Sequence, residues 1–254
     1  MSEIPKPVKT LKPLIEGVRN GHLVLLGMTK YGKTTLAKHL LMQSDLFDRR
    51  KNPVGIILDT KHDDSLLECG YFCDTLTELA YYIDMKAPRI VFRPPGTSAR
   101  KNVLTEIIKM VFHYRSLKTH ANVPFAIFID ELQLYAGKQE KHEGLEMLST
   151  TGAGKDIHGI FMAQRMQDIH EQSLSQCDTM VCFFMKEQSS YLKRRGMDEL
   201  IDWLRFLKLN PFFFAFETRG VWQLHEPVPF DDGSEKGTTT EYSIDSSDDM
   251  YFPR

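Results

Sequence analysis

Residues 22–43 have the sequence HLVLLGMTKYGKTTLAKHLLMQ. HLVLLG (22–27) is a short apolar run that predicts a buried strand, and TTLAKHLLMQ (34–43) predicts the helix that follows it. Between them, the residues from Gly27 to Thr34 match the pattern G-x-x-x-x-G-K-[ST] in full. A strand, a glycine-containing loop and a helix in this order predict a phosphate-binding loop, or P-loop.

This loop predicts binding of ATP together with Mg²⁺. Glycines let backbone N–H groups turn inward around phosphate oxygens, and the start of the helix adds a partial positive charge. Lys33 is expected to reach the β- and γ-phosphates, and the Thr34 hydroxyl is expected to ligate Mg²⁺. The expected nucleotide-binding residues are Gly27, Met28, Thr29, Lys30, Tyr31, Gly32, Lys33, Thr34 and Thr35.

A second stretch, FAIFIDE (125–131), predicts the catalytic half of the site. Its apolar residues predict a central strand that brings Asp130 to the metal beside the P-loop. Glu131 follows directly and is expected to take a proton from the attacking water. Together the two acids favour an ATPase over a kinase for small molecules, which would not need the second acid.

Gln164 lies at the end of another apolar run, HGIFMAQ (158–164). An amide at that position can hydrogen-bond both the water and the γ-phosphate, so we expect Gln164 to sense whether the phosphate is still attached. The segment from Thr60 to Asp63 fits the guanine-reading T-K-x-D pattern of GTPases, but it precedes Asp130, whereas GTPases carry it afterwards. We interpret it as a chance match and expect ATP rather than GTP.

Strand-like and helix-like segments alternate along the chain, which predicts a mainly parallel sheet flanked by helices. The predicted fold class is therefore an α/β P-loop NTPase of the RecA/ASCE type. A closing β-hairpin is expected over 211–227, turning at Arg219-Gly220. Strands are expected at 22–27, 54–60, 89–95, 123–132, 158–165 and 179–185, and helices at 34–43, 102–117, 141–150, 167–175 and 197–207.

Composition divides the chain into three parts. Residues 1–20 are expected to form an N-terminal extension, 21–230 the ATPase domain, and 231–254 an acidic tail whose composition is typical of disorder. The tail holds seven acids and two basic residues, which leaves 30 basic and 27 acidic residues elsewhere. No apolar run approaches the roughly 20 residues that span a bilayer. We therefore expect no stable membrane insertion and a cytoplasmic location.

Three further segments carry a resemblance to a known family. ILDTK (57–61) ends a strand in Asp and Lys. HGIFMAQRMQDIHEQSLSQCDTMVCFF (158–184) is similar to a family stretch in which a strand ending in Gln-Arg is followed by a short helix and an apolar strand. FFFAFETRGVWQLHEPV (212–228) resembles the family's terminal hairpin. With the P-loop, this order resembles the FtsK–HerA superfamily over about residues 20 to 228. It is most similar to the genome-packaging ATPases of membrane-containing icosahedral viruses.

The resemblance implies a homo-oligomeric ring, a hexamer or a pentamer, that pumps double-stranded DNA. It also implies that a positive residue of the neighbouring subunit completes each ATP-binding site. Family members often carry Gly-Arg before the strand that ends in the sensing glutamine, where this chain has Gly154-Lys155. Lys155 is therefore the candidate by position, and Arg165 the candidate by residue type, because arginine offers a planar fork of donors. Lys30 could instead reach the γ-phosphate within the same subunit.

DNA contacts are expected at short basic clusters, because DNA binding requires clustered positive charge. The candidates are Arg100-Lys101, the loop 137–141, and the cluster from Lys193 to Arg195. The resemblance adds a capsid vertex or portal protein as a further partner, with the host cytoplasm or the virion as the location.

Three other functions stay open at this stage. One is a cellular HerA-like or conjugative DNA-pumping ATPase, and another is a protein-assembly or secretion ATPase. The third is a nucleotide-dependent switch without a motor role.

Overall fold

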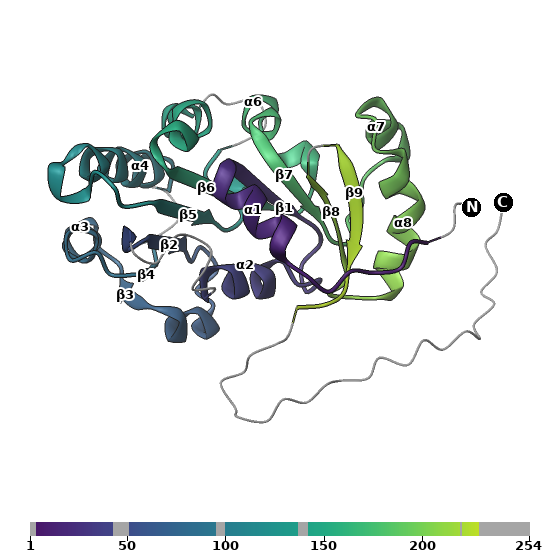
Figure 1. Ribbon diagram of the computed structural model, residues 1–254, viewed down its shortest axis with the longest axis horizontal. Coiled ribbons are helices and arrows are strands. Elements are labelled where there is room, and N and C mark those ends of the chain that lie inside the picture. Colours follow the sequence, from purple (N-terminus) through teal and green to yellow (C-terminus); the bar gives the residue numbers. More distant parts are fainter. Residues whose placement is uncertain (1–3, 43–50, 95–99, 137–141, 219, 229–254) are drawn as a thin grey trace.

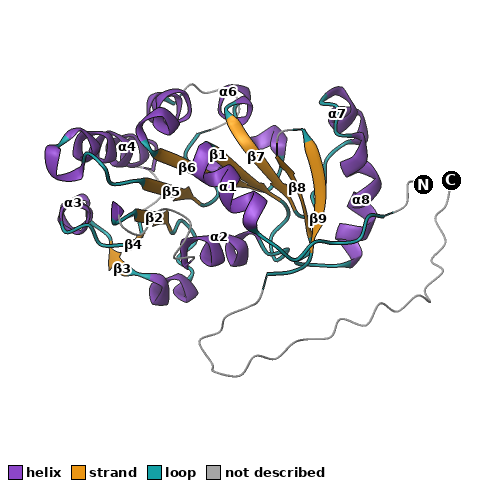
Figure 2. Ribbon diagram, in the orientation of Figure 1, coloured by secondary structure: helices purple, strands orange, loops and turns teal. Residues whose placement is uncertain are grey.

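The structure is a computed structural model of the 254-residue chain. It describes residues 4–42, 51–94, 100–136, 142–218 and 220–228. Within these ranges nine strands form a single sheet, with helices on both of its faces (Figures 1 and 2). The acidic tail expected over 231–254 lies outside the described residues.

The helices, in chain order, are α1 (Lys12–Asn20), α2 (Lys33–Met42), α3 (Leu76–Asp84), α4 (Arg100–Ser116), α5 (Glu143–Met147), α6 (Glu171–Ser175), α7 (Ser189–Arg194) and α8 (Asp198–Leu209). The strands are β1 (His22–Leu26), β2 (Val54–Leu58), β3 (Tyr71–Cys73), β4 (Arg89–Phe92), β5 (Phe125–Ile129), β6 (Ile157–Ala163), β7 (Cys177–Cys182), β8 (Phe214–Thr218) and β9 (Val221–His225). Shorter helical turns are Asp64–Cys69, Lys118–His120, Leu132–Leu134, Leu148–Gly152, Ala153–Lys155 and Met166–Asp168.

The order of strands in the sheet is β3-β4-β2-β5-β6-β1-β7-β8-β9. All pairs from β3 to β7 are parallel, whereas β8 pairs antiparallel with both β7 and β9. This confirms the predicted mainly parallel sheet with a C-terminal hairpin. Strand β6 lies between β1, which leads into the P-loop, and β5, which leads to Asp130. Of the predicted turn, Arg219 lies outside the described residues.

Two hydrophobic cores cover the two faces of the sheet. In β1, Leu23 and Leu25 pack on one face together with α1 and α2, while Val24 and Leu26 pack on the other face with α3, α4 and α8. Every residue of β1, β2, β5 and β6 is buried. Burial on both faces explains why these strands are continuous apolar runs in the sequence instead of alternating ones.

The N-terminal residues are attached to the sheet. Within the extension expected over 1–20, α1 buries Leu14 and Val18 against β1 and β7. Val8 forms a parallel bridge with His225 of β9, in which its N–H donates to Leu224 O at 2.8 Å and its carbonyl accepts the Glu226 N–H at 3.0 Å. This segment covers the outer edge of the last strand.

Two predicted helices differ in the structure. The helix expected over 167–175 is a 3₁₀ turn, Met166–Asp168, followed by α6, because Ile169 adopts an extended conformation between them. The helix expected over 141–150 begins at Glu143 and continues through a π-helical turn, Leu148–Gly152, as far as Lys155. Helices α1, α3 and α7 and the edge strand β3 were not predicted.

Helices of bilayer-spanning length and apolarity are not found among the residues that the structure describes.

Candidate active site

The expected site residues gather at one edge of the sheet. Strands β2, β5, β6 and β1 are neighbours and parallel, so their carboxyl ends lie side by side. Lys61 follows β2, Asp130 and Glu131 follow β5, Gln164 follows β6, and the P-loop follows β1. The crevice outside the carboxyl ends of parallel strands is where open α/β sheets bind ligands.

The P-loop needs its two glycines for conformational and steric reasons. Gly27 has φ 151° and Gly32 has φ 111°, backbone conformations that other L-residues rarely adopt. A Cβ atom on Gly27 would lie 2.6 Å from Phe183 Cβ, and one on Gly32 would lie 3.0 Å from the rings of Phe183 and Phe212. The loop backbone therefore packs closely against the chain after β7 and the chain before β8.

Lys33, the first residue of α2, extends back into the loop. Its side chain is buried, and Nζ donates to the carbonyl oxygens of Gly27 at 2.6 Å and Met28 at 3.3 Å. Burial lowers the pKa of Lys33, and the negative charge of Glu131 opposes that shift. The ammonium group is thus held inside the loop, among the backbone groups that a bound phosphate would face.

The remaining P-loop residues differ in exposure. Thr29 and Lys30 are exposed at the tip, where Lys30 has φ 70°. Thr34 and Thr35 are half-buried in the first turn of α2, and the side chain of Met28 is also half-buried. Expected phosphate and metal contacts of these residues stay predictions.

The C-terminal part of the chain holds the P-loop in place at Tyr31. The Phe212 N–H donates to the Tyr31 carbonyl at 3.2 Å, and Phe212 adopts φ 73° in doing so. The Tyr31 ring lies 5.1 Å from the Phe184 ring, and its hydroxyl donates to Lys208 O, in the last turn of α8, at 3.5 Å. Sequence reasoning missed this contact, because no local signal links residue 31 to residue 212.

Asp130, the expected metal ligand, is a buried carboxylate at the end of β5. It is 3% exposed, and its Oδ1 accepts the Glu131 N–H at 3.0 Å. Burial raises the pKa of Asp130 to about 6, although the charge of Lys61 acts in the opposite direction. A divalent cation would stabilise the ionised carboxylate, so the residue fits the Mg²⁺ expected there with Thr34.

Thr60 links the ends of β2 and β5. It is buried, and its Oγ1 donates to the Asp130 carbonyl at 3.0 Å and lies 3.0 Å from the Tyr135 hydroxyl. The first residue of the T-K-x-D match therefore supports the chain beside Asp130.

Glu131 lies at the centre of the site. It is 2% exposed and adopts a left-handed backbone conformation, φ 49° and ψ 56°. Its carboxylate forms an ion pair with Lys61 and accepts hydrogen bonds from Gln133 Nε2 and from Gln164 Nε2, the latter at 3.4 Å. Burial acts to raise the pKa of Glu131, but Lys61 and Gln133 together hold it below its ordinary value. At neutral pH the residue is an ionised carboxylate able to accept a proton.

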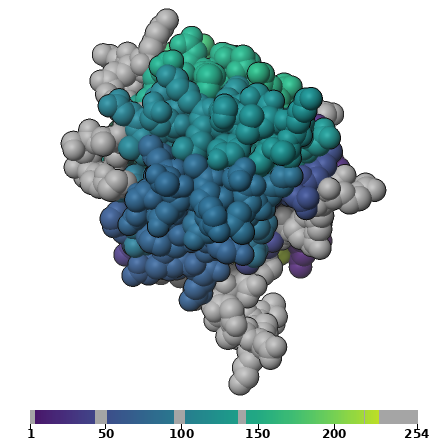
Figure 3. Space-filling view, turned by 90° about the vertical axis from the view of Figure 1, so that its left-hand side faces the viewer, coloured from purple at the N-terminus to yellow at the C-terminus, as the bar shows by residue number. Residues whose placement is uncertain are grey.

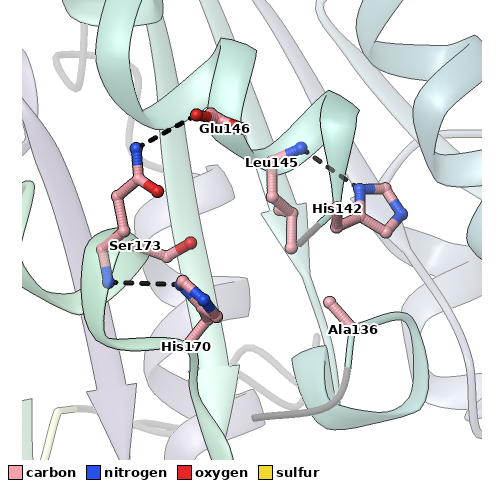
Figure 4. A pocket seen from close by; sticks show the side chains of 7 residues that line it. Ala136, His142, Leu145, Glu146, His170 and Ser173 are labelled. Carbon is pink, nitrogen blue, oxygen red and sulfur yellow. Dashed lines mark hydrogen bonds between the residues drawn. The ribbon is translucent and has the colours of Figure 1, made fainter. Parts of the chain in front are cut away.

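A small hollow lies between α5 and α6 (Figure 4). His142 and His170 enter it from the starts of the two helices, and each uses Nδ1 to accept a backbone N–H, from Leu145 at 3.2 Å and from Gln172 at 3.3 Å. Glu146 on its rim accepts a hydrogen bond from the Gln172 side chain at 3.4 Å. These polar groups serve to cap and join short helices.

No family model and no curated protein matches the sequence, but solved structures match the fold. The genome packaging NTPase B204 from Sulfolobus turreted icosahedral virus 2, in complex with ATP-gammaS, aligns over 83% of this chain and 98% of its own, with a TM-score of 0.65 and 16% identity. EssC (ATPases 2 and 3) from Geobacillus thermodenitrificans aligns with a TM-score of 0.52 and 13% identity, over 86% of this chain and 41% of its own. The chain therefore shares the fold of these P-loop NTPases. The pCW3 conjugation coupling protein TcpA, with ATPgS, shares this fold at a TM-score of 0.50 and 12% identity, over 84% of this chain and 62% of its own.

Lys155 and Arg165, the two candidates for the positive residue that completes a neighbouring ATP site, lie at opposite ends of β6. Arg165 follows its carboxyl end and pairs with Asp168, through Nη2 at 3.0 Å and Nε at 3.3 Å. Lys155 precedes its amino end, with Nζ 5.7 Å from the centre of the Phe112 ring. Because the seven residues of β6 span about 23 Å, Lys155 is far from the P-loop of this chain. Lys155 therefore cannot contact a nucleotide bound at the P-loop of the same chain.

Proposed function

We propose that this chain is an ATPase that uses hydrolysis to move double-stranded DNA. The observation that carries the proposal is the position of Glu131. Its ionised carboxylate lies at the carboxyl ends of the strands, in contact with Gln164. Only β6 separates β5, which Glu131 follows, from β1, which leads into a complete P-loop. P-loop enzymes that hydrolyse ATP place a group that positions or deprotonates water beside the phosphates.

The residues divide the work of hydrolysis. Backbone N–H groups of the P-loop and Lys33 bind and orient the phosphates. Glu131 accepts a proton from the water molecule, while the oxygen of that water attacks the γ-phosphorus and ADP leaves. Gln164 orients that water. Asp130 and Thr34 would hold Mg²⁺, which supplies positive charge to the phosphate oxygens. The buried walls of the site strengthen each of these electrostatic contacts.

Helix α7 supports the DNA part of the proposal. Lys193 and Arg194 are exposed there, and the guanidinium carbon of Arg194 lies 5.9 Å from the centre of the Tyr191 ring. Arg195 forms an ion pair with Glu171, and its guanidinium carbon lies 5.1 Å from the centre of the same ring. Exposed cations on one short helix suit contact with a phosphate backbone. Of the other expected contacts, residues 137–141 and the side chains of Arg100 and Lys101 lie outside the described part of the chain.

The finer proposal is packaging of a viral genome by a homo-oligomeric ring. Its support is the fold shared with a genome packaging NTPase over 98% of that chain, and with a conjugation coupling protein. The ring, a hexamer or pentamer, would place Lys155 of one subunit at the nucleotide of the next. A capsid vertex or portal would then be its docking partner, in a host cytoplasm or on the virion.

The test is the ATPase rate with and without linear double-stranded DNA, together with size-exclusion chromatography. Lys33→Ala is the inactive control variant. Glu131→Gln should retain ATP binding while losing nearly all turnover. Stimulation by DNA with assembly into a ring supports the translocase. A monomer whose turnover ignores DNA would contradict it and favour a protein-assembly or secretion ATPase, or a nucleotide-dependent switch.

A further inference from the structure

A segment that carries three lysines lies at the outer edge of β9. Residues 4–12 pass this edge before α1 continues the chain, and the backbone bonds of Val8 hold them there (Figure 1). Lys6, Lys9 and Lys12 are all exposed. We call these three lysines the basic strap. Its backbone is attached to the sheet, while its ammonium groups face solvent.

The surroundings of the basic strap are rich in positive charge. From residue 4 to residue 20 the chain has four basic side chains and one acid, Glu16. Lys9 forms an ion pair with Glu226 at 3.6 Å, but the Lys9 side chain is 82% exposed, and ion pairs of this kind contribute little stability. In the described part of the chain the strap is therefore a local concentration of positive charge that is open to an anion.

The acidic tail, residues 231–254, begins close to the basic strap. Val8 and His225 pair in parallel, so the chain beyond each of them continues in the same direction. Val228, the last described residue, packs against the same core as Leu11. Two residues separate Val228 from the first acid of the tail, a span of about 10 Å at full extension. The tail thus starts within reach of the strap.

The tail carries the charge that the strap lacks. It holds seven acids and two basic residues, and its first three acids fall within the five residues from Asp231 to Glu235. Because tail and strap belong to one chain and their ends are close, the contact is intramolecular, with an effective concentration on the order of millimolar. Even a weak electrostatic contact is populated at such a concentration.

We propose that the basic strap binds the acidic tail of the same chain, and that a DNA phosphate backbone must displace the tail to bind the strap. Docking of the tail follows from the charges and the connectivity of the chain. The competition with DNA rests on the proposed function. A lysine ammonium group acts as a point charge without a fixed fork of donors, so the same three lysines bind carboxylates or phosphates. The tail thereby lowers the affinity of the protein for DNA.

The first experiment tests the docking without DNA. A carbodiimide joins lysine amines to carboxylates in direct contact, and mass spectrometry of the digested full chain identifies the pairs. Crosslinks from the tail should go to the basic strap and should be lost in 1 M salt, where the Debye length is about 3 Å. The control lysines are exposed ones in the blue and teal segments, toward the β3 end of the sheet (Figures 1 and 3): Lys51, Lys109 and Lys118.

A mixture of heavy-isotope and unlabelled protein shows which chain supplies the tail. Crosslinked peptides whose two halves carry the same label support docking within one chain. Pairs that mix the labels at random would place the tail on a neighbouring chain and overturn the proposal. Crosslinks spread evenly over the strap and the three control lysines would also overturn it, as would an absence of crosslinks between tail and strap.

The second experiment measures DNA affinity in a double-mutant cycle of full-length variants. The neutral-tail variant replaces the seven acids of the tail by Asn or Gln, and the neutral-strap variant replaces the three lysines by Gln. At about 0.1 M salt the neutral-tail variant should bind linear double-stranded DNA about tenfold more tightly than the wild type, the equivalent of three exposed ion pairs. In the neutral-strap background the same change should alter the affinity less than about twofold. An equal gain in both backgrounds would mean that the tail only repels DNA, and would overturn the proposal.

The salt dependence tests whether DNA occupies the strap once the tail is neutral. Removal of the three strap lysines from the neutral-tail variant should reduce the slope of the log–log plot by about 2–3 units, because each phosphate contact contributes about 0.9. Replacement of the three control lysines by Gln should leave the slope unchanged. A slope that does not change when the strap is neutralised overturns the competition.

The experiments separate this proposal from the proposed function. If no variant binds DNA and DNA leaves ATP turnover unchanged, the DNA part of the proposed function fails and the competition fails with it, while the crosslinks still decide whether the tail docks. If DNA stimulates turnover of the wild type but the neutral-tail variant binds DNA no more tightly, only the competition is overturned.

Discussion

Acid should destabilise this fold through His22, the first residue of β1. The imidazole is 1% exposed, and its Nδ1 accepts the Gly159 N–H at 2.9 Å, so that nitrogen carries no proton in the folded protein. Burial, and then the neighbouring His158, lower the pKa of His22 to about 4, whereas Asp178 opposes the shift. Protonation of the ring would break the bond to Gly159 and leave a charge inside the sheet.

The sign and size of the effect follow from linkage. Below its ordinary pKa of 6.5, His22 binds a proton in the unfolded chain but not in the folded one. The contribution of His22 is therefore fully present above pH 6.5 and is lost as the pH falls toward 4. Because one pKa unit corresponds to about 1.4 kcal/mol, the full loss is about 3 kcal/mol. Burial also lowers the pKa of His158, which adds a loss of the same sign.

The assay is urea unfolding at pH 7.5 and pH 4.5, followed by the fluorescence of the buried Trp203. The matched variant is His22→Asn, whose amide oxygen can accept the Gly159 N–H but does not titrate. Between pH 7.5 and pH 4.5 both proteins should lose free energy of unfolding, and the loss should be about 2–3 kcal/mol smaller for His22→Asn than for the wild type. His113→Asn, at an exposed position on α4, is the control. If His22→Asn and the wild type lose the same free energy, the assignment of this acid sensitivity to His22 is wrong.

Three further predictions concern the nucleotide edge and the DNA surface. Gly32→Ala should weaken ATP binding and lower the free energy of unfolding by about 1–3 kcal/mol, because the φ of 111° and the two nearby rings leave no place for a methyl group. ATP titration measures the first effect, and urea unfolding measures the second. Thr60→Val should lower the free energy of unfolding in urea by about 1–2 kcal/mol, because it removes the hydrogen bond to the Asp130 carbonyl. In the Thr60→Val protein, Tyr135→Phe should lower the free energy of unfolding by less than it does alone, because the two hydroxyls contact each other. Fully additive losses of free energy would contradict that shared contact. Arg194→Gln should reduce the salt dependence of DNA binding by about one unit of slope in a log–log titration, and an unchanged slope would exclude Arg194 from the DNA surface.

Much of the sheet was predictable because its central strands are buried on both faces. Such strands appear as apolar runs, and the residues that follow them, Asp130, Glu131 and Gln164, were expected at the same edge, where the structure brings Glu131 and Gln164 into contact. Helix α3 was missed although its signal is present. Thr75 and Glu78 have the spacing of a capping box, and Thr75 Oγ1 accepts the Glu78 N–H at 3.2 Å and so caps the helix. The Glu78 carboxylate accepts the Thr75 hydroxyl at 3.0 Å. Strand β3 has only three residues, with Tyr71 and Phe72 exposed, too little for any periodicity to show.

Contacts between distant residues were not predictable from one sequence. Spacing along the chain does not reveal that β6 inserts between β1 and β5, which is what brings Gln164 beside Glu131 and leaves Lys155 at the opposite edge. Nor does it reveal that Lys61 forms an ion pair with Glu131, because strand order decides which ends are neighbours. The contact of Phe212 with the P-loop depends in the same way on the tertiary fold.

The position of Val8 beside β9 has a consequence for how the protein folds. During synthesis from the N-terminus, the chain around Val8 emerges early, but its hydrogen-bonding partners at Leu224 and Glu226 are among the last of the described residues to follow. Contacts so distant in sequence form slowly, because a long loop must close first. Until then the outer edge of β9 offers unpaired backbone groups to any passing strand. The nascent chain therefore goes through an interval in which the hairpin end of the sheet is open to association, and docking of the N-terminal segment ends it.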